Sequence, residues 1–514
     1  MATATLGLLN HTEIDDADDN TGWVETVTAD TDIKVEGTGS LSGILRADAE
    51  TAYYDHGSAP STGVGKVWRG WINSNSLPYM GAMGSNAYTV YVYDGSSNSN
   101  KIDLFGSDTY PGGWFYWWQD MDDFTGVTLA NVQRWCVEAG HDSNAKNAIN
   151  TWMDVMRYLD GYYITGGLTG DRVTLADVAL ADKGTTTLYG YGIVQEFGGA
   201  YFLTGELEIG NSTTTTWFEM DGDVLIGLEP VGDCTVSAGI YTISTLGTGC
   251  RCYIKNSVLR GPGAGDSTRL YFDFSSTDPD TVEFTDNLVS DAGTIDFASG
   301  MAATGNVFDD CGQIDANGAD LSGSTVKNYE GTSDTGAVSW TPATDPNGEL
   351  DDMVFVKGTA STHAIEFGIA SPTTMTLTGI DFSGYNAADG QTDSALLIRR
   401  TTGTVDIALV GCTGTIKYKS LGATVTLTAS KSATFTPIEN GSAFTITRNS
   451  DNLLLTDVPI TSGGEVVYSY DGSLDGTATT VHLIIVGKEP IDFLWTIAEG
   501  TVPISQITDR VYDT

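Results

Sequence analysis

The sequence predicts an all-β protein of several domains, and three observations support this prediction. Short runs of alternating apolar and polar residues outnumber helical patterns along the whole chain. The 62 glycines, against 13 prolines, supply the tight turns that join short strands. A chain of 514 residues is too long for one core, so about two to four domains are expected. We expect more than about 40% strand and less than about 12% helix.

Residues 1–205 contain most of the aromatic residues and predict a β-sandwich. Tyr88–Tyr93 alternates with a period of two residues, as a strand does. Many such short strands, separated by turn residues, are typical of a sandwich or jelly roll. One helix is expected over residues 171–182, with an Asp as its cap and an apolar face formed by Val173, Ala176 and Leu180.

Four segments of this region resemble the jelly rolls of concanavalin-type lectins and glucanases. They are Thr21–Val24, Val35–Gly43, Ile149–Met156 and Leu159–Ile164. In that family a Gly-Ser-Leu strand follows an early turn, and two adjacent strands lead to a surface turn. The resemblance implies a concanavalin-like jelly-roll β-sandwich over residues 1–205, in a family in which carbohydrate binding is common.

Residues 206–435 contain fewer aromatic residues and repeat a short β-branched motif. Aligning the repeats superposes Asn256, Asn287, Asn306 and Ser324 at spacings of about 20 to 30 residues, which is typical of a right-handed parallel β-helix. A periodic β-sandwich is the alternative. One rung cannot bury its apolar face alone, so rungs stack. The residues expected to point inward are Ile254, Val258, Phe284, Leu288, Val307, Val326, Ile380 and Phe382, and the expected corners include Gly305, Gly323, Gly379 and Gly411.

Residues 436–514 predict a small antiparallel β-sandwich. Phe444–Thr447, Glu465–Tyr470 and Val481–Val486 have the alternation of strands, and Asp-Gly pairs at 471–472 and 475–476 mark turns. Such a domain would cap the open end of the β-helix, which otherwise exposes unpaired backbone groups.

The formal net charge of −43 excludes several classes of partner. Such a surface repels the phosphates of nucleic acids and the anionic surface of a membrane. No run approaches the roughly 18 apolar residues of a membrane-spanning helix. The first residues lack a basic region followed by an apolar run, so no signal peptide is expected.

The motifs of common enzymes are missing from the sequence. No phosphate-binding loop, dinucleotide fingerprint, nucleophile elbow or HExxH motif occurs, and we expect no enzymatic activity. Glu219, Asp221 and Asp223 alternate on one predicted strand face. On the flank of a β-helix such a stripe could bind Ca²⁺ or act on a sugar, although a solvated acidic face is the simpler interpretation.

Two segments are candidate binding sites. The densest acidic cluster is a candidate Ca²⁺ loop formed by Asp15, Asp16, Asp18 and Asp19. It lacks the Gly and distant Glu of an EF-hand, and no cofactor other than Ca²⁺ is considered. The second segment combines aromatic rings with carboxylates, and we expect its second aromatic face to be covered by another protein chain, by the β-helix domain or by a sugar. Its candidate contact residues are Trp114, Trp117, Trp118, Asp120, Asp122 and Asp123, with Trp117 and Trp118 on opposite faces of a strand.

A jelly roll, a β-helix and a small β cap on a chain without a signal peptide resemble the virion surface proteins of tailed phages. These are tail spikes, tail fibres and capsid decoration or head-fibre proteins. The resemblance implies a non-enzymatic structural protein that is made in the host cytoplasm and displayed on the virion surface. Its implied partners are two further copies in a homotrimer, other virion proteins and host-surface glycan.

Two alternatives stay open. One is a tail-spike polysaccharide depolymerase, which needs paired carboxylates in a groove. The other is a bacterial surface adhesin, which needs an export route. The chain has no coiled-coil stalk or collagen-like segment, and this favours a compact spike or decoration protein over a fibre shaft.

Overall fold

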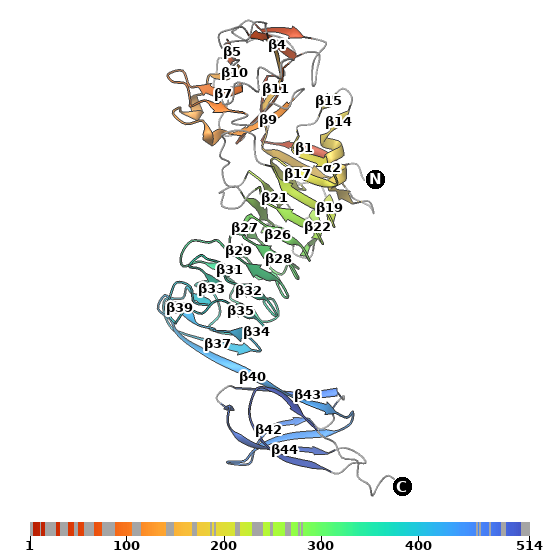
Figure 1. Ribbon diagram of the computed structural model, residues 1–514, viewed down its shortest axis with the longest axis vertical. Helices are drawn as coiled ribbons and strands as arrows, with labels where there is room; N and C mark the ends of the chain where they lie inside the picture. Colours follow the sequence, from red (N-terminus) through yellow and green to blue (C-terminus); the bar gives the residue numbers. More distant parts are fainter. Residues whose placement is uncertain are drawn as a thin grey trace. The chain divides into compact units, whose positions relative to one another are not determined.

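The computed structural model shows a chain built almost entirely of strands (Figure 1). Strands account for 53% of it and helices for 5%, which confirms the predicted all-β class. The structure describes residues 4–10, 12–15, 27–30, 40–45, 50–55, 66–74, 88–104, 115–139, 149–166, 172–185, 188–189, 192–210, 216–228, 240–246, 250–262, 269–275, 278, 281–458, 461, 464–471, 474–484 and 490–504. Within these residues, no helix is long and apolar enough to span a membrane.

The chain divides into two compact units, which we describe separately. The first comprises residues 1–332, 337–339 and 358–360, and the second comprises residues 333–336, 340–357 and 361–514.

The first unit begins with two antiparallel sheets whose aromatic side chains meet. Trp68 is fully buried and makes edge-to-face contacts with Trp117, 4.9 Å away in its own sheet, and with Trp135, 4.8 Å away in the other sheet. The larger sheet has the order β3-β4-β11-β6-β9, with β2 also on β11. Its strands are β2 Thr12–Asp15, β3 Val27–Asp30, β4 Ser40–Leu45, β6 Val67–Ser74, β9 Phe115–Asp120 and β11 Ile149–Tyr158. The smaller sheet, of order β5-β10-β7-β8, contains β5 Glu50–Asp55, β10 Arg134–Ala139, β7 Tyr88–Tyr93 and β8 Ile102–Asp103.

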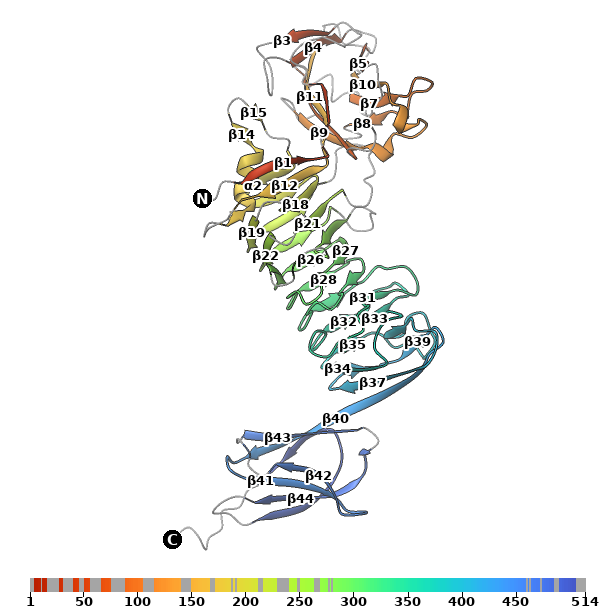
Figure 2. The same cartoon turned by 180° about the vertical axis from the view of Figure 1, so that it is seen from behind.

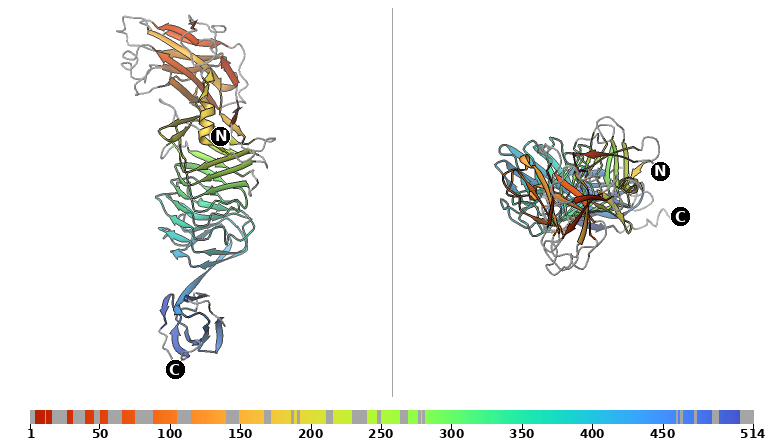
Figure 3. Two further views of the ribbon diagram at one scale, coloured as in Figure 1. Left: turned by 90° about the vertical axis from the view of Figure 1, so that its right-hand side faces the viewer. Right: turned by 90° about the horizontal axis from the view of Figure 1, so that it is seen from above.

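The rest of the first unit consists largely of parallel ladders, and Figure 3 shows their strands stacked side by side. One ladder begins with β1 Thr5–Leu9, which is antiparallel to its neighbour, and continues through β12 Gly161–Thr165, β18 Glu206–Ile209, β21 Thr242–Thr245, β24 Leu270–Asp273, β27 Ala292–Asp296, β29 Ile314–Asp315 and β31 Gly336–Trp340. A second ladder contains β16 Val194–Phe197, β17 Ala200–Leu203, β20 Val224–Gly227, β23 Val258–Arg260, β26 Leu288–Ser290, β28 Val307–Asp309 and β30 Thr325–Lys327. The third contains β13 Val173–Thr174, β19 Thr216–Asp221, β22 Cys250–Lys255 and β25 Val282–Thr285.

A row of buried polar side chains, which we call the amide row, follows the corner between the second and third ladders. It consists of Ser257, Asn287, Asn306 and Ser324. Asn287 Oδ1 accepts from the backbone N–H of Ser257 at 3.0 Å, and Asn306 Oδ1 accepts from that of Asn287 at 2.9 Å. The Ser324 hydroxyl accepts from the backbone N–H of Asn306 at 3.1 Å. The predicted alignment was therefore correct at three positions and wrong by one residue at Asn256.

The corner also explains which inward residues were predicted wrongly. Ile254, Phe284, Val326, Ile380 and Phe382 are buried as expected. Val258 and Leu288 are 36% and 42% exposed, and Val307 is half-buried. The residue before each member of the amide row has a positive φ. This conformation shifts the alternation of inward and outward side chains by one residue, so the amide-row residue itself points inward. These corner residues are Asn256, Asp286, Gly305 and Gly323, and the buried positions are Leu259, Val289 and Phe308. Gly379 and Gly411 have the same backbone conformation in the second unit.

The second unit combines parallel ladders with an antiparallel module (Figure 2). The ladders contain β32 Val354–Val356, β35 Asp381–Ser383 and β38 Thr413–Gly414; β33 His363–Phe367, β36 Leu396–Ile398 and β39 Tyr418–Ser420; and β34 Thr374–Thr378, β37 Thr404–Val410 and β40 Thr424–Ile438. The first half of β40 is parallel to β37, and its second half pairs with antiparallel β43 Gly464–Asp471 and parallel β46 Gly500–Pro503. The remaining sheet contains β42 Leu453–Val458, β41 Ala443–Arg448, β44 Ala478–Ile484 and β45 Ile491–Thr496. The predicted strands Phe444–Thr447 and Glu465–Tyr470 lie in β41 and β43, and β44 contains the described part of the third, Val481–Val486.

Candidate functional site

The aromatic and acidic segment predicted as a contact site lies on β9 and the turn after it. Trp117 and Trp118 are each 3% exposed and point to opposite faces. Trp117 packs on Trp68 between the two antiparallel sheets, whereas Trp118 makes an edge-to-face contact with Tyr241, 5.8 Å away in the parallel region of the same unit. This chain therefore covers both tryptophans itself.

The carboxylates of this segment differ in exposure. Asp120 is buried and accepts a hydrogen bond from the backbone N–H of Asp122 at 2.9 Å, so it caps the short 3₁₀ helix η1 Met121–Asp123. Asp122 is exposed and Asp123 is half-buried. Trp114 lies outside the described residues. Contact of this segment with a ligand or a partner remains a prediction.

A buried arginine that the sequence analysis missed joins β6 to the parallel region. Arg69 is 1% exposed. Its guanidinium donates to the backbone oxygen of Leu159 at 2.6 Å, to the hydroxyl of Tyr116 at 2.6 Å and to the backbone oxygen of Thr204 at 2.6 Å. The sequence did contain a signal for this burial, because Arg69 is a single arginine within the aromatic run Val67–Ile72. On a strand with one buried face, such a guanidinium needs several hydrogen-bond acceptors.

A pocket of about 570 Å³ opens beside this link in the first unit. The walls are mainly apolar, and Lys183, Gln195 and Glu196 bring polar groups of both signs to it. This combination suits a ligand with an apolar face and several hydroxyl groups. The lining residues are Trp71, Ala176, Ala179, Leu180, Asp182, Lys183, Gly192, Val194, Gln195, Glu196 and Tyr201.

The helix α2 Leu175–Asp182 forms one wall of the pocket, and its start differs from the prediction. Thr174 caps it with a reciprocal capping box to Asp177, and Val173 belongs to strand β13. Leu180 is 63% exposed, so it does not belong to the buried face. Asp182 is buried and accepts hydrogen bonds from the Tyr162 hydroxyl and from the backbone N–H of Val194, which fixes this carboxylate as part of the wall.

Two of the three carboxylates of the predicted acidic stripe are paired with neighbouring bases, and the third, Asp223, lies beyond the end of β19. Glu219 forms ion pairs with Arg172 and with Lys255 Nζ, 3.1 Å away, and these contacts lower the pKa of its carboxyl group. Asp221 Oδ2 lies 3.6 Å from Lys255 Nζ. Burial raises the pKa of Asp223, and its carboxylate accepts from the backbone N–H of Asp221 at 3.2 Å. Glu219 and Asp221 thus share cations on the surface of the third ladder.

A second set of carboxylates, which we call the acidic row, lies on adjacent strands of the first ladder. Asp273 is opposite Asp296, and Asp296 is opposite Asp315. Burial and the charges of both neighbours raise the pKa of Asp296 to about 6. Among the described residues, no group of three or more His, Cys, Asp or Glu side chains could hold a metal ion. Of the predicted Ca²⁺ residues, Asp15 ends strand β2, and Asp16, Asp18 and Asp19 lie outside the described residues.

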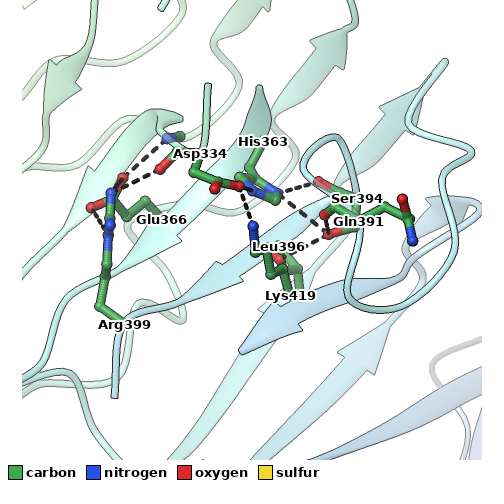
Figure 4. Close-up of polar contacts among 9 residues, drawn as sticks. Asp334, His363, Glu366, Gln391, Ser394, Leu396, Arg399 and Lys419 are labelled. Carbon is green, nitrogen blue, oxygen red and sulfur yellow. Dashed lines mark hydrogen bonds and ion pairs between the residues drawn. The ribbon is translucent and has the colours of Figure 1, made fainter. Parts of the chain in front are cut away.

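A polar cluster in the second unit brings a histidine, a serine and an aspartate together (Figure 4). His363 is fully buried, and its Nδ1 lies 2.7 Å from the backbone oxygen of Ser394. Nδ1 must therefore carry the proton, and Nε2 faces Asp334 Oδ1 at 3.6 Å. Lys419 Nζ binds the same Asp334 oxygen at 2.6 Å, and Arg399 pairs with Glu366 at 2.7 Å.

This cluster lacks the geometry of a hydrolytic triad. The Ser394 hydroxyl is 3.3 Å from Nδ1, the nitrogen that already donates to a carbonyl, so the imidazole has no lone pair directed at it. Ser394 is also fully buried, and its hydroxyl donates to the backbone oxygen of Gln391 at 3.2 Å. The arrangement serves to fasten adjacent strands.

The comparisons with known proteins give little guidance. No family model matches the chain, and no curated protein matches it. Among solved structures, a β-1,2-glucanase from Parabacteroides distasonis is 9% identical, with a TM-score of 0.22, over 30% of this chain and 22% of the glucanase. The cellulose induced protein Cip1 is 16% identical, with a TM-score of 0.18, over 28% of this chain and 88% of that protein. The chain thus spans less than a quarter of the glucanase, and TM-scores this low carry no argument about fold or function.

Proposed function

We propose that this chain is a non-enzymatic structural protein displayed on the surface of a tailed-phage particle, as a capsid decoration protein, head fibre or tail spike. The proposal includes the finer fold: a jelly-roll sandwich over residues 1–205, a right-handed parallel β-helix over 206–435 and a small antiparallel β-sandwich over 436–514. It also includes assembly as a homotrimer, with other virion proteins and host-surface glycan as partners.

The observation that carries the proposal is the run of parallel ladders with the amide row at its corner. Asn287 and Asn306 each bind the preceding rung twice, because the side-chain oxygen accepts from a backbone N–H of that rung and the side-chain amide donates to one of its backbone oxygens, at 2.9 Å to Ile254 and at 2.6 Å to Phe284. Such cross-links between rungs make a stack of short strands rigid, because one rung cannot slide without breaking buried hydrogen bonds. Rigidity of this kind suits a protein that projects from a particle.

Two further observations favour a structural role over catalysis. Ion pairs hold the Glu219 carboxylate, and hydrogen bonds to carbonyl groups hold the Ser394 hydroxyl. The net charge of −43 keeps such a protein soluble and away from the nucleic acid of the particle. The pocket beside α2 is the candidate site for host glycan.

Labelling of particles with an antiserum raised against the purified chain tests the proposal. We expect regular labelling of the capsid or the tail in electron micrographs, and no new reducing ends when the chain is incubated with host polysaccharide. Labelling of the bacterial envelope instead would support an adhesin. Release of reducing ends that is lost in Asp221→Ala or Asp223→Ala would support a depolymerase.

A further inference from the structure

The outward face of the third ladder carries a second cluster, which we call the arginine–tryptophan face. It comprises Arg172, Trp217, Arg251 and Tyr253. On β19 and β22 the buried side chains alternate with these, so Trp217 and Tyr253 are half-buried and Arg251 is exposed. The strand register places Arg251 directly opposite Trp217.

The aromatic rings hold both guanidinium groups in place. The Arg172 guanidinium lies 4.8 Å from the Trp217 ring centre and 5.7 Å from that of Tyr253. The Arg251 guanidinium lies 5.1 Å from the Trp217 ring centre. The two rings meet edge to face at 6.0 Å. A guanidinium stacked in this way loses little further freedom on binding an anion, because its orientation is already restricted.

Charge is distributed unevenly on this face. Arg172 shares Glu219 with Lys255, but within the described residues Arg251 has no carboxylate within 4.0 Å and no side-chain hydrogen bond. An exposed arginine without a carboxylate partner is unexpected in a chain with 67 acidic and 24 basic residues. Arg172 and Lys255 therefore share Glu219 and Asp221, Glu283 lies opposite Tyr253 on the next strand, and the donors that are free within the described residues belong to Arg251.

We propose that the arginine–tryptophan face binds a carboxylate-bearing sugar of an acidic polysaccharide. The sugar carboxylate accepts two parallel hydrogen bonds from the Arg251 guanidinium, which is the geometry that arginine favours. The half-buried ring of Tyr253 contacts the C–H face of the same sugar. This site and its ligand class are distinct from the pocket beside α2. The proposal rests on the proposed function in one respect, which is that a displayed protein meets host polysaccharide.

Calorimetric titration of the full chain with an oligogalacturonate, and with its methyl-esterified form, tests the inference. We expect binding of the acid form only. Arg251→Gln is expected to weaken it about tenfold or more, since a charged hydrogen-bonded pair is lost. Arg134→Gln is the matched control, because Arg134 also stacks on a ring, 5.1 Å from the centre of Tyr93, in the sandwich. It should leave the affinity unchanged.

Several results would overturn the inference: no binding of the acid form, equal binding of the esterified form, or equal affinity of Arg251→Gln and the unmodified chain. Tight binding of an acidic peptide in place of the oligogalacturonate would also overturn it and would indicate a protein partner. Circular dichroism should show an unchanged melting temperature for Arg251→Gln, because this side chain is exposed. Binding by the purified chain does not depend on where the protein is displayed, so this test and particle labelling fail independently.

Discussion

The amide row and the acidic row lie along different ladders of the same parallel region, and stacking has opposite energetic consequences for them. In the amide row, each side chain accepts a hydrogen bond from the backbone of a neighbouring rung, and the side-chain amides of Asn287 and Asn306 also donate one. Stacking amides on successive rungs therefore satisfies both their donors and their acceptors. In the acidic row, Asp273, Asp296 and Asp315 can only accept when ionised, and stacking places like charges on neighbouring strands about 5 Å apart. One geometry therefore stabilises amides and destabilises carboxylates.

Breaking the amide row should give the largest effect. Asn306→Leu removes the acceptor of the Asn287 backbone N–H and the donor to the backbone oxygen of Phe284, both buried. We expect a loss of about 2–4 kcal/mol in the free energy of unfolding of the first unit. Urea unfolding followed by circular dichroism measures this loss. Asn386→Leu, at an exposed position, is the control and should change the free energy by less than about 0.5 kcal/mol.

Neutralising the centre of the acidic row should have the opposite sign. The folded-state pKa of Asp296 is raised to about 6 from an ordinary value of 3.8, so the folded chain binds this proton more tightly than the unfolded chain does. Stability is then lost as pH rises between about 4 and 6 and stays lower above that range. Asp296→Asn should raise the melting temperature at pH 8 by roughly 2–4 °C, the shift from about 1 kcal/mol, because partial exposure discounts the effect. An equal gain at pH 4 and pH 8 would contradict this explanation.

His363 gives a third case, a buried group that is hydrogen-bonded in its neutral form. Burial lowers the pKa of its imidazole, and the carbonyl of Ser394 and the carboxylate of Asp334 oppose that effect in part. Because the unfolded chain then binds the proton more tightly, acidification below about pH 6.5 should destabilise the second unit. His363→Gln keeps a donor toward Ser394 and does not titrate. Its melting temperature should fall less between pH 7 and pH 5 than that of the unmodified chain.

The sequence predicts the strands of this protein better than it predicts its corners. Alternation identifies Tyr88–Tyr93 and the buried positions Ile254 and Phe284, because each pattern is local. It fails at Val258 and Leu288, because a residue with positive φ lies two positions before each of them. That residue exchanges the inward and outward positions of the strand that follows. A positive φ at Asn256 or Asp286 has only a weak signal in a single sequence, because these residue types occupy other conformations more often.

The candidate sites depend on contacts between distant parts of the chain, and this limits their prediction. Trp118 is covered by Tyr241, more than a hundred residues later, and the sequence alone does not show which distant segment provides that cover. Glu219 lies on the predicted strand face, but its partners Arg172 and Lys255 come from neighbouring rungs. Only the register of the ladders shows that Glu219 and Asp221 are paired with cations.

The smallest expected effect comes from removing one end of the acidic row. Asp273 is exposed, and its Oδ1 accepts hydrogen bonds from the backbone N–H and the hydroxyl of Ser275, which an asparagine can replace. Asp273→Asn should therefore leave the melting temperature nearly unchanged. It should still lower the pKa of Asp296, because the charge of Asp273 is one of the causes that raise it. Burial and Asp315 remain, so that pKa should stay above the ordinary value of 3.8. Titration of the Asp296 carboxyl carbon by nuclear magnetic resonance measures the change. An unchanged pKa would mean that burial alone sets it and that the strands do not couple these charges.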